Sequence, residues 1–134
     1  MLSIDSKGER EDEIKDKIIA ANRALHANKK LLKSKILTQK TKIRLYKSLI
    51  RPIITYGAEV LIMTKKEEEN LRVAERKILR SILGPVKLDE NEFRPRKNAE
   101  IAQHLDDDNV VTKIKQQRAR WLGHVWRAGP TDNI

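Results

Sequence analysis

The sequence predicts an all-α fold, a small bundle of about four to five helices with a short irregular or extended segment near residues 53–63. Apolar residues recur at intervals of three to four positions along most of the chain, which places them on one face of a helix. They make up 39% of the sequence, whereas aromatic residues make up only 4%. We therefore expect a core of Ile, Leu, Val and Ala, as in helices that pack on helices.

The first helix is expected to begin near Gly8. Ser6 and Glu9 have the spacing of a capping box, and the acidic residues that follow suit the positive end of a helix dipole. A narrow apolar stripe along this segment should face the core, and it comprises Ile14, Ile18, Ala21, Leu25 and Leu32.

A second helix is expected over residues 39–56, where Pro52 should kink or end it. The stretch 53–63 around Gly57 suits a helical continuation, an extended segment or a tight turn, and we favour a helix followed by a turn. Tyr56 is expected in the core with its hydroxyl at the rim. The second helix also has a broad apolar face whose side chains are expected in the core. They are Ile43, Tyr46, Leu49, Ile50 and Ile53.

The third helix has the clearest boundaries. Thr64 and Glu67 have the residue types and spacing of a capping box, and Gly84 followed by Pro85 should stop the helix. Its buried stripe is expected to comprise Leu71, Ala74, Ile78 and Ile82.

Residues 85–97 contain two prolines and scattered charges and are predicted to form an irregular linker. This linker would separate a helical bundle, residues 1–84, from a second group of helices, residues 98–134. The second group should open with a short helix at residues 99–105.

The last helix is expected to end near Gly129 and Pro130. Trp121 falls on its apolar face and Trp126 at the edge of that face, so core packing is favoured over base stacking for Trp121. The residues that offer a cap for its start are Asp106, Asp107, Asp108 and Asn109.

Charge is concentrated in one part of the chain. Lys and Arg number 29 against 19 Asp and Glu, which gives a net charge of +10. Residues 23–51 hold ten of the Lys and Arg residues and no acidic residue, so this segment accounts for the whole excess. A solvated lysine-rich face is the alternative, but a located excess of this size favours a nucleic acid as partner.

The predicted nucleic-acid-binding residues form three groups along the chain. A row on the second helix has spacings of four, three and four residues, which aligns its members on one face. Two lysines precede that row, and a weaker row lies on the last helix. In chain order the residues are Lys30, Lys33, Lys40, Arg44, Lys47, Arg51, Arg120, His124 and Arg127.

No constellation for catalysis is recognisable, so we expect no enzymatic activity from this chain alone and no cofactor. The acidic run 106–108 precedes a helix, which favours capping over a two-metal site. The three histidines, His26, His104 and His124, fall on separate elements and there is no cysteine, so no metal site is expected. The apolar run 60–63 is far too short for a bilayer span, and an intracellular protein of the nucleus or cytoplasm is expected.

Three ordered motifs carry a family resemblance: residues 41–59 (TKIRLYKSLIRPIITYGAE), 71–83 (LRVAERKILRSIL) and 120–127 (RWLGHVWR). Together they resemble the region after the palm in reverse transcriptases of non-LTR retrotransposons, of the endonuclease-reverse transcriptase type. Leu61 stands where a tryptophan is usual in that family, and no Cys/His knuckle follows the last helix.

The resemblance implies that residues 1–84 form a thumb-like bundle and residues 98–134 connection helices. It implies RNA or DNA, as a template–primer duplex, as partner, together with the fingers and palm of a parent RNA-directed DNA polymerase that would carry the catalytic aspartates. The alternative is a helical protein-interaction module that docks onto such a palm or onto another protein through exposed apolar faces.

Overall fold

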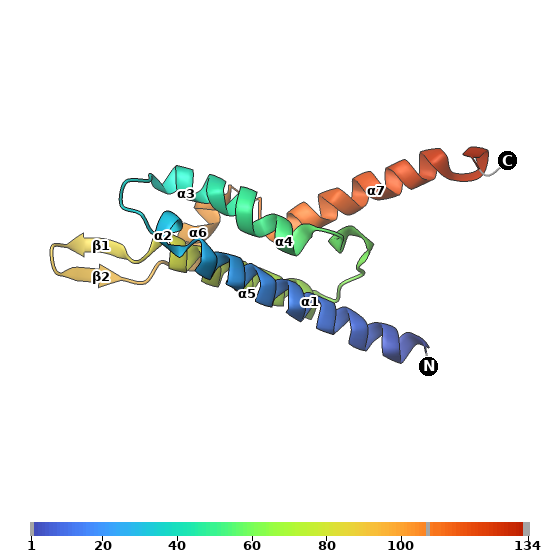
Figure 1. Ribbon diagram of the computed structural model, residues 1–134, viewed down its shortest axis with the longest axis horizontal. Helices are drawn as coiled ribbons and strands as arrows, with labels where there is room; N and C mark the ends of the chain where they lie inside the picture. Colours follow the sequence, from blue (N-terminus) through green and yellow to red (C-terminus); the bar gives the residue numbers. More distant parts are fainter. Residues whose placement is uncertain (1, 107, 133–134) are drawn as a thin grey trace.

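Helices account for about three quarters of the chain, which confirms the predicted fold class. The computed structural model describes residues 2–106 and 108–132, with the side chains of residues 8–106 and 108–127. Figure 1 shows long helical segments that run back and forth, with a small hairpin at one end and the last helix projecting at the other. No helix among the described residues has the length and apolarity needed to cross a membrane.

The first helix, α1, spans Leu2–Ala27 and is followed by the single turn α2, Lys29–Leu32. The expected start near Gly8 is wrong: no proline interrupts residues 2–8, and the helix runs through them. The predicted stripe is confirmed, because Ile14, Ala21, Leu25 and Leu32 are buried and Ile18 packs against them.

The second helix consists of three connected pieces: α3 (Gln39–Leu45), the π-helical turn η1 (Tyr46–Ile50) and α4 (Arg51–Thr55). In the π-turn the backbone N–H of Arg51 bonds to the carbonyl of Tyr46, five residues back. Pro52 has no N–H and its ring crowds the preceding helical turn, so the wider turn accommodates the proline without breaking the helix.

The π-turn shifts which side chains face the core. Ile43, Tyr46 and Ile50 are buried as expected, but Ile54 replaces Ile53, and Leu49 is exposed. Tyr56, expected in the core, is exposed, because it follows the last residue of α4. The segment beyond it contains a left-handed turn at Gly57 and a short 3₁₀ helix, η2 (Ala58–Val60).

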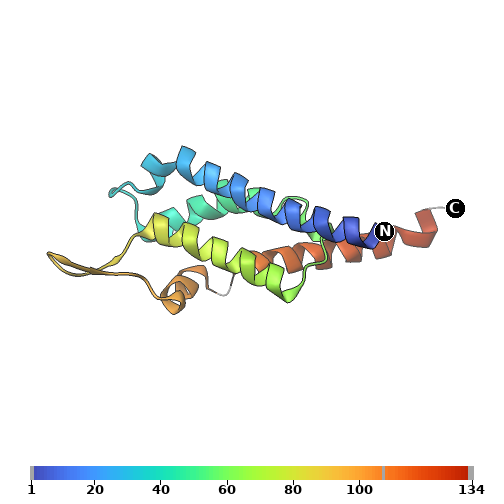
Figure 2. The same cartoon turned by 90° about the horizontal axis from the view of Figure 1, so that it is seen from below.

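The third helix, α5, spans Lys65–Leu83 and agrees with the prediction at both ends. Thr64 and Glu67 form the expected capping box, and Gly84 takes a positive φ of 71° at the C-cap. Glu67 also receives hydrogen bonds of 3.1 Å from the Arg10 guanidinium of α1, so the cap joins two helices. Figures 1 and 2 show α1 and α5 lying side by side along most of their length.

Residues 85–97 are not an irregular linker throughout, since they contain an antiparallel hairpin of β1 (Val86–Asp89) and β2 (Glu92–Arg94). Its base is fixed by side chains. Arg96 donates to the carbonyl of Gly84 at 2.7 Å, and Arg94 donates to both carboxylate oxygens of Glu100 at 2.6 and 2.9 Å. Most side chains of the hairpin itself are exposed.

Two further helices follow, α6 (Asn98–Leu105) and α7 (Val110–Asp132). The short helix was expected; the last one continues past the predicted stop at Gly129 and Pro130. Ile101, Leu105 and Ile114 join the same hydrophobic cluster as α1, the α3–α4 helix and α5. The two groups of helices expected at residues 1–84 and 98–134 therefore contribute to one core, and their assignment as a thumb-like bundle and connection helices stays a prediction.

Candidate nucleic-acid interface

A hollow between α3 and α6 contains the centre of the predicted cationic row. It has a volume of about 500 Å³, and Lys40, Arg44 and Lys47 line one side of it. Thr38 positions α3 by accepting a 3.2 Å hydrogen bond from the Thr41 backbone at the start of the helix. The other side comes from α6 and the residue that follows it, and contributes Gln103, His104 and Asp106. We call this hollow the α3–α6 groove.

Lys40 and Arg44 are the exposed cations of the groove. Neither forms an ion pair among the described residues, so their charges are open to an external anion. His104 adds no charge at neutral pH: burial, followed by the charge of Arg96, lowers the pKa of His104 below its ordinary value. The groove therefore offers two exposed cations, the neutral hydrogen-bonding groups of Gln39, Gln103 and His104, and one exposed acidic side chain, that of Asp106.

Lys47 is half-buried, and its charge is already in use. Its Nζ lies 3.2 Å from Oδ2 of Asp108. Partial burial raises the pKa of Asp108, but Arg51 and Lys47 outweigh this and hold the pKa below its ordinary value. The carboxylate is thus ionised and partly neutralises this end of the groove.

Arg51 does not extend the exposed row, and its predicted position on the outer face is wrong. The residue is 3% exposed, because the π-turn rotates it into the core. Its guanidinium lies 3.3 Å from Oε2 of Glu75 and 3.1 Å from Oδ2 of Asp108. Arg51 is therefore a buried structural cation and does not reach an external ligand.

Glu75 is the centre of this buried network, and sequence analysis missed it. It is 1% exposed on α5 and accepts hydrogen bonds from the Tyr46 hydroxyl at 2.5 Å and from the Val110 backbone at 2.9 Å. Burial raises the pKa of Tyr46 well above its ordinary value, and Glu75 raises it further. The available signal was an acidic residue four positions after Leu71, within the apolar stripe of α5.

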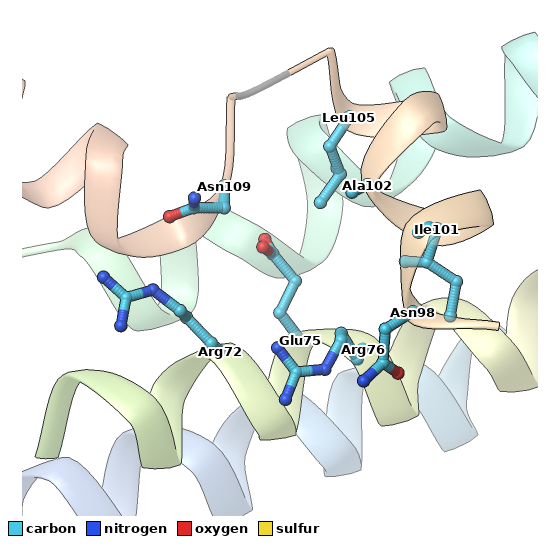
Figure 3. A pocket seen from close by; sticks show the side chains of 9 residues that line it. Arg72, Glu75, Arg76, Asn98, Ile101, Ala102, Leu105 and Asn109 are labelled. Carbon is cyan, nitrogen blue, oxygen red and sulfur yellow. The ribbon is translucent and has the colours of Figure 1, made fainter. Parts of the chain in front are cut away.

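A second hollow, of about 310 Å³, lies between α5, α6 and the start of α7. Figure 3 shows Glu75 pointing from α5 toward Asn109, with Arg72 and Arg76 on the same helix. Both arginines are paired, Arg72 at 3.5 Å and Arg76 at 3.1 Å from Glu69. Since its charges are matched within the chain, we assign this hollow to the packing of the helices.

Lys30 and Lys33 are exposed on α2 and at its C-cap. They lie in the part of the chain that precedes the groove and contains no acidic residue. They extend the set of exposed cations that remains available for a nucleic acid.

The residues that were expected to cap α7 have different roles in the structure. Asn109 caps α7 by accepting a 2.9 Å hydrogen bond from the Thr112 backbone, as one of the predicted caps. Asp106 instead ends α6 in a left-handed conformation with φ of 55°, and Asp108 pairs with Lys47 and Arg51. Asp107 lies outside the described residues. Among residues 2–106 and 108–132 no group of three or more potential metal ligands was found.

The other predicted row, Arg120, His124 and Arg127, is exposed on the outer half of α7. Figure 1 shows this half extending beyond the bundle. Trp121 was expected in the core but is 41% exposed, because the apolar face of α7 continues past the helices that could cover it. An open hollow of about 710 Å³ runs along this part of the helix.

Comparison with known proteins gives one weak relationship. A stretch of 92 residues, 69% of this chain, is 26% identical to a transposon-derived protein of Caenorhabditis elegans whose function is uncharacterised. The chain spans about a third (33%) of the length of that relative. No family model matches the sequence, and no solved structure matches it. The chain is thus similar to a transposon-derived protein.

Proposed function

We propose that this chain is the thumb and connection region of a non-LTR retrotransposon reverse transcriptase and that it holds the template–primer duplex through phosphate contacts. The observation that carries the proposal is the α3–α6 groove with the exposed Lys40 and Arg44, in a stretch of 29 residues without an acidic side chain. A regularly charged polyanion is the ligand that such a surface suits. The transposon-derived relative and the three sequence motifs support the same assignment.

The structure reduces the number of cations available for this role. Arg51 is buried and Lys47 is paired with Asp108, so within residues 23–51 the predicted cations that remain exposed are Lys30, Lys33, Lys40 and Arg44. Contacts to phosphates position a protein on the duplex but do not read the bases, so we expect binding that does not depend on the nucleic-acid sequence. The polymerase chemistry itself is assigned to the palm of the parent enzyme, and the site of action to the nucleus or cytoplasm.

Salt dependence tests the proposal. If all four cations touch phosphates, the logarithm of affinity for a DNA duplex should fall with the logarithm of salt concentration with a slope of up to about −3.6, at about 0.9 per contact. Replacement of Lys30, Lys40 and Arg44 by Gln should flatten the slope by almost three units and weaken binding to different sequences alike.

The matched control replaces Lys65, Lys66 and Lys87 by Gln, which removes the same charge from exposed positions outside the acid-free segment 23–51. This variant should bind almost as well as the unaltered protein. Equal losses in the two triple variants, with circular dichroism unchanged, would show that net charge and not the groove determines binding.

Exposed apolar side chains favour a second candidate, a protein-interaction module. Leu122 and Val125 are exposed on α7, and Val60 and Ile62 are exposed in the segment that contacts it. An apolar surface of this kind is typical of docking sites. In this case the four cations would only aid solubility, and their replacement would leave binding to a palm domain unchanged.

A further inference from the structure

We infer that the outer half of α7 binds an unpaired nucleic-acid strand, with a base stacked on Trp121 and phosphates held by Arg120 and Arg127. This goes beyond the duplex-holding role of the α3–α6 groove, because it assigns a different form of nucleic acid to a different helix.

The geometry of α7 brings these groups together. Arg120, His124 and Arg127 fall within about 60° around the helix axis at 100° per residue, so they form one cationic edge. The hollow of about 710 Å³ follows this edge, and its lining also includes Trp121, Ala119 and Gly123. A surface that holds an unpaired strand needs an aromatic ring for base stacking and cations for the phosphates. The hollow has both, and its small residues let a ligand approach the helix closely.

Gly123 is not required by the fold. A Cβ at this position would meet no atom of the described chain within 4 Å, and glycine is less favourable than alanine inside a helix. The missing side chain leaves room beside Arg120 and Arg127, on the side of the cationic edge away from Trp121, and both sides line the same hollow. A flat ligand that approaches the helix closely makes use of that room.

Charge identifies the ligand as a polyanion. Residues 110–127 contain five Lys and Arg residues and no acidic residue. Lys115 pairs with Glu68 at 3.4 Å, whereas Arg120 and Arg127 line the hollow. A protein partner would be expected on the exposed apolar side of α7, at Leu122 and Val125, and neither of these residues lines the hollow. Trp121 lies between that apolar side and the cationic edge and does line the hollow. Base stacking on an exposed tryptophan requires bases that are not already stacked in a duplex, so the strand is unpaired.

Two pairs of matched variants test the inference on the full chain, with labelled 12-residue oligo(dT) and oligo(U) as probes. Trp121 lines the hollow, whereas Trp126 does not and is more exposed, at 86%. Trp121→Leu should weaken binding at least about fivefold, and Trp126→Leu by less than twofold. Gly123→Leu should weaken binding because it fills the hollow, whereas Gly123→Ala should have a smaller effect.

A Cβ at Gly123 meets no neighbouring side chain or distant backbone, so Gly123→Ala should fold normally, and circular dichroism shows whether Gly123→Leu does. A loss of affinity with unchanged circular dichroism then reports on the ligand. Duplex binding should be unaffected by all four changes, which separates this inference from the α3–α6 groove. Equal effects of the two tryptophan variants, or none from Gly123→Leu, would overturn it. It would also be overturned if Trp121→Leu altered only self-association in sedimentation, which would identify a protein interface.

Discussion

Arg51 and Glu75 form an ion pair inside the core, with Nη2 of Arg51 3.3 Å from Oε2 of Glu75 and both residues at most 3% exposed. The pair joins α4 to α5. The same carboxylate accepts hydrogen bonds from Tyr46 and from the first residue of α7, so one acidic side chain connects three segments that are distant in sequence. Loss of either partner would leave an unpaired charge in the core, which strongly destabilises a fold.

Removal of Glu75 alone should be strongly destabilising. Glu75→Leu leaves the guanidinium of Arg51 buried with only part of its partners, and breaking a buried pair in this way costs about 3–5 kcal/mol. The free energy of unfolding, measured by urea denaturation, should fall by that order.

The control is the double variant Arg51→Met with Glu75→Leu. Removal of both charges replaces the pair by apolar packing, which is much less costly than an unpaired buried charge. The double variant should therefore be more stable than Glu75→Leu alone. A double variant that is less stable than the single one would contradict the assignment of Arg51 as a cation that needs Glu75.

Asp108→Asn should strengthen nucleic-acid binding. Asp108 holds Lys47 at 3.2 Å beside the α3–α6 groove, and loss of its charge would free Lys47 for a phosphate. The slope of log affinity against log salt should become steeper by up to about 0.9. Fluorescence anisotropy with a labelled duplex over a range of salt concentrations measures both effects.

The same change in a chain that already carries Lys47→Gln should have a much smaller effect. If Asp108→Asn strengthens binding equally in both backgrounds, the gain comes from the general loss of negative charge and not from Lys47. An unchanged affinity in the unaltered background would show that Lys47 does not reach the ligand.

Stability should decline in acid through Glu67. Burial raises the pKa of Glu67, but hydrogen bonds from the Thr64 backbone and from Arg10 outweigh it and hold the pKa below its ordinary value. Because the folded-state pKa lies below the unfolded one, the unfolded chain takes up protons first as the pH falls. The contribution is therefore present above about pH 4.3, the ordinary value, and is lost below it.

Glu67→Gln isolates this contribution, because glutamine does not titrate. Glutamine can also complete a capping box, so the variant should lose mainly the charge that faces Arg10, about 1 kcal/mol at pH 7, and its stability should fall less steeply between pH 5 and pH 3. Urea denaturation at several pH values compares the two proteins. Parallel declines would show that other carboxylates account for the acid sensitivity.

The chain alone should not extend a primer. Asp108 is committed to Lys47 and Arg51, and Asp106 ends α6, so the acidic run does not provide the convergent carboxylates that two metal ions need. Incubation with template, labelled primer, nucleotides and Mg²⁺ should give no product. Extension that disappears when Asp107 and Asp108 are both changed to Asn would contradict this expectation.

Local signals predicted the parts of the fold that depend on few residues. The α5 boundaries follow from Thr64, Glu67 and Gly84, whose roles are determined within one or two helical turns. The stripe of α1 follows from simple periodicity. The hairpin was missed because β1 and β2 have only four and three residues, too few for their alternation of apolar and polar residues to stand out. The bonds that fix the base of the hairpin are made by Arg94 and Arg96 to residues outside it.

The candidate site was predictable only where the helix is regular. Lys40 and Arg44 precede the π-turn and are exposed as expected, whereas Arg51 follows it and is buried. Periodicity also placed Trp121 correctly on the apolar face of α7. The exposure of Trp121 depends on where the neighbouring helices end, and this cannot be predicted from the sequence of α7 alone.

The wide turn of η1 has the effect of a one-residue insertion. In an uninterrupted α-helix Arg51 would stand in line with Lys40, Arg44 and Lys47, whereas here the same guanidinium braces the inside of the bundle. Conversion of the π-turn to a regular α-helix at unchanged length would turn everything beyond it by about 100°, lengthening the outer line of charge and removing the brace. Deletion of one residue within 46–50 would instead leave a regular α-helix in which Arg51 still faces the core. The choice between a π-turn and an α-helical turn at residues 46–50 therefore decides whether Arg51 stabilises the core or extends the exposed cationic row, and no single substitution of Arg51 has both effects.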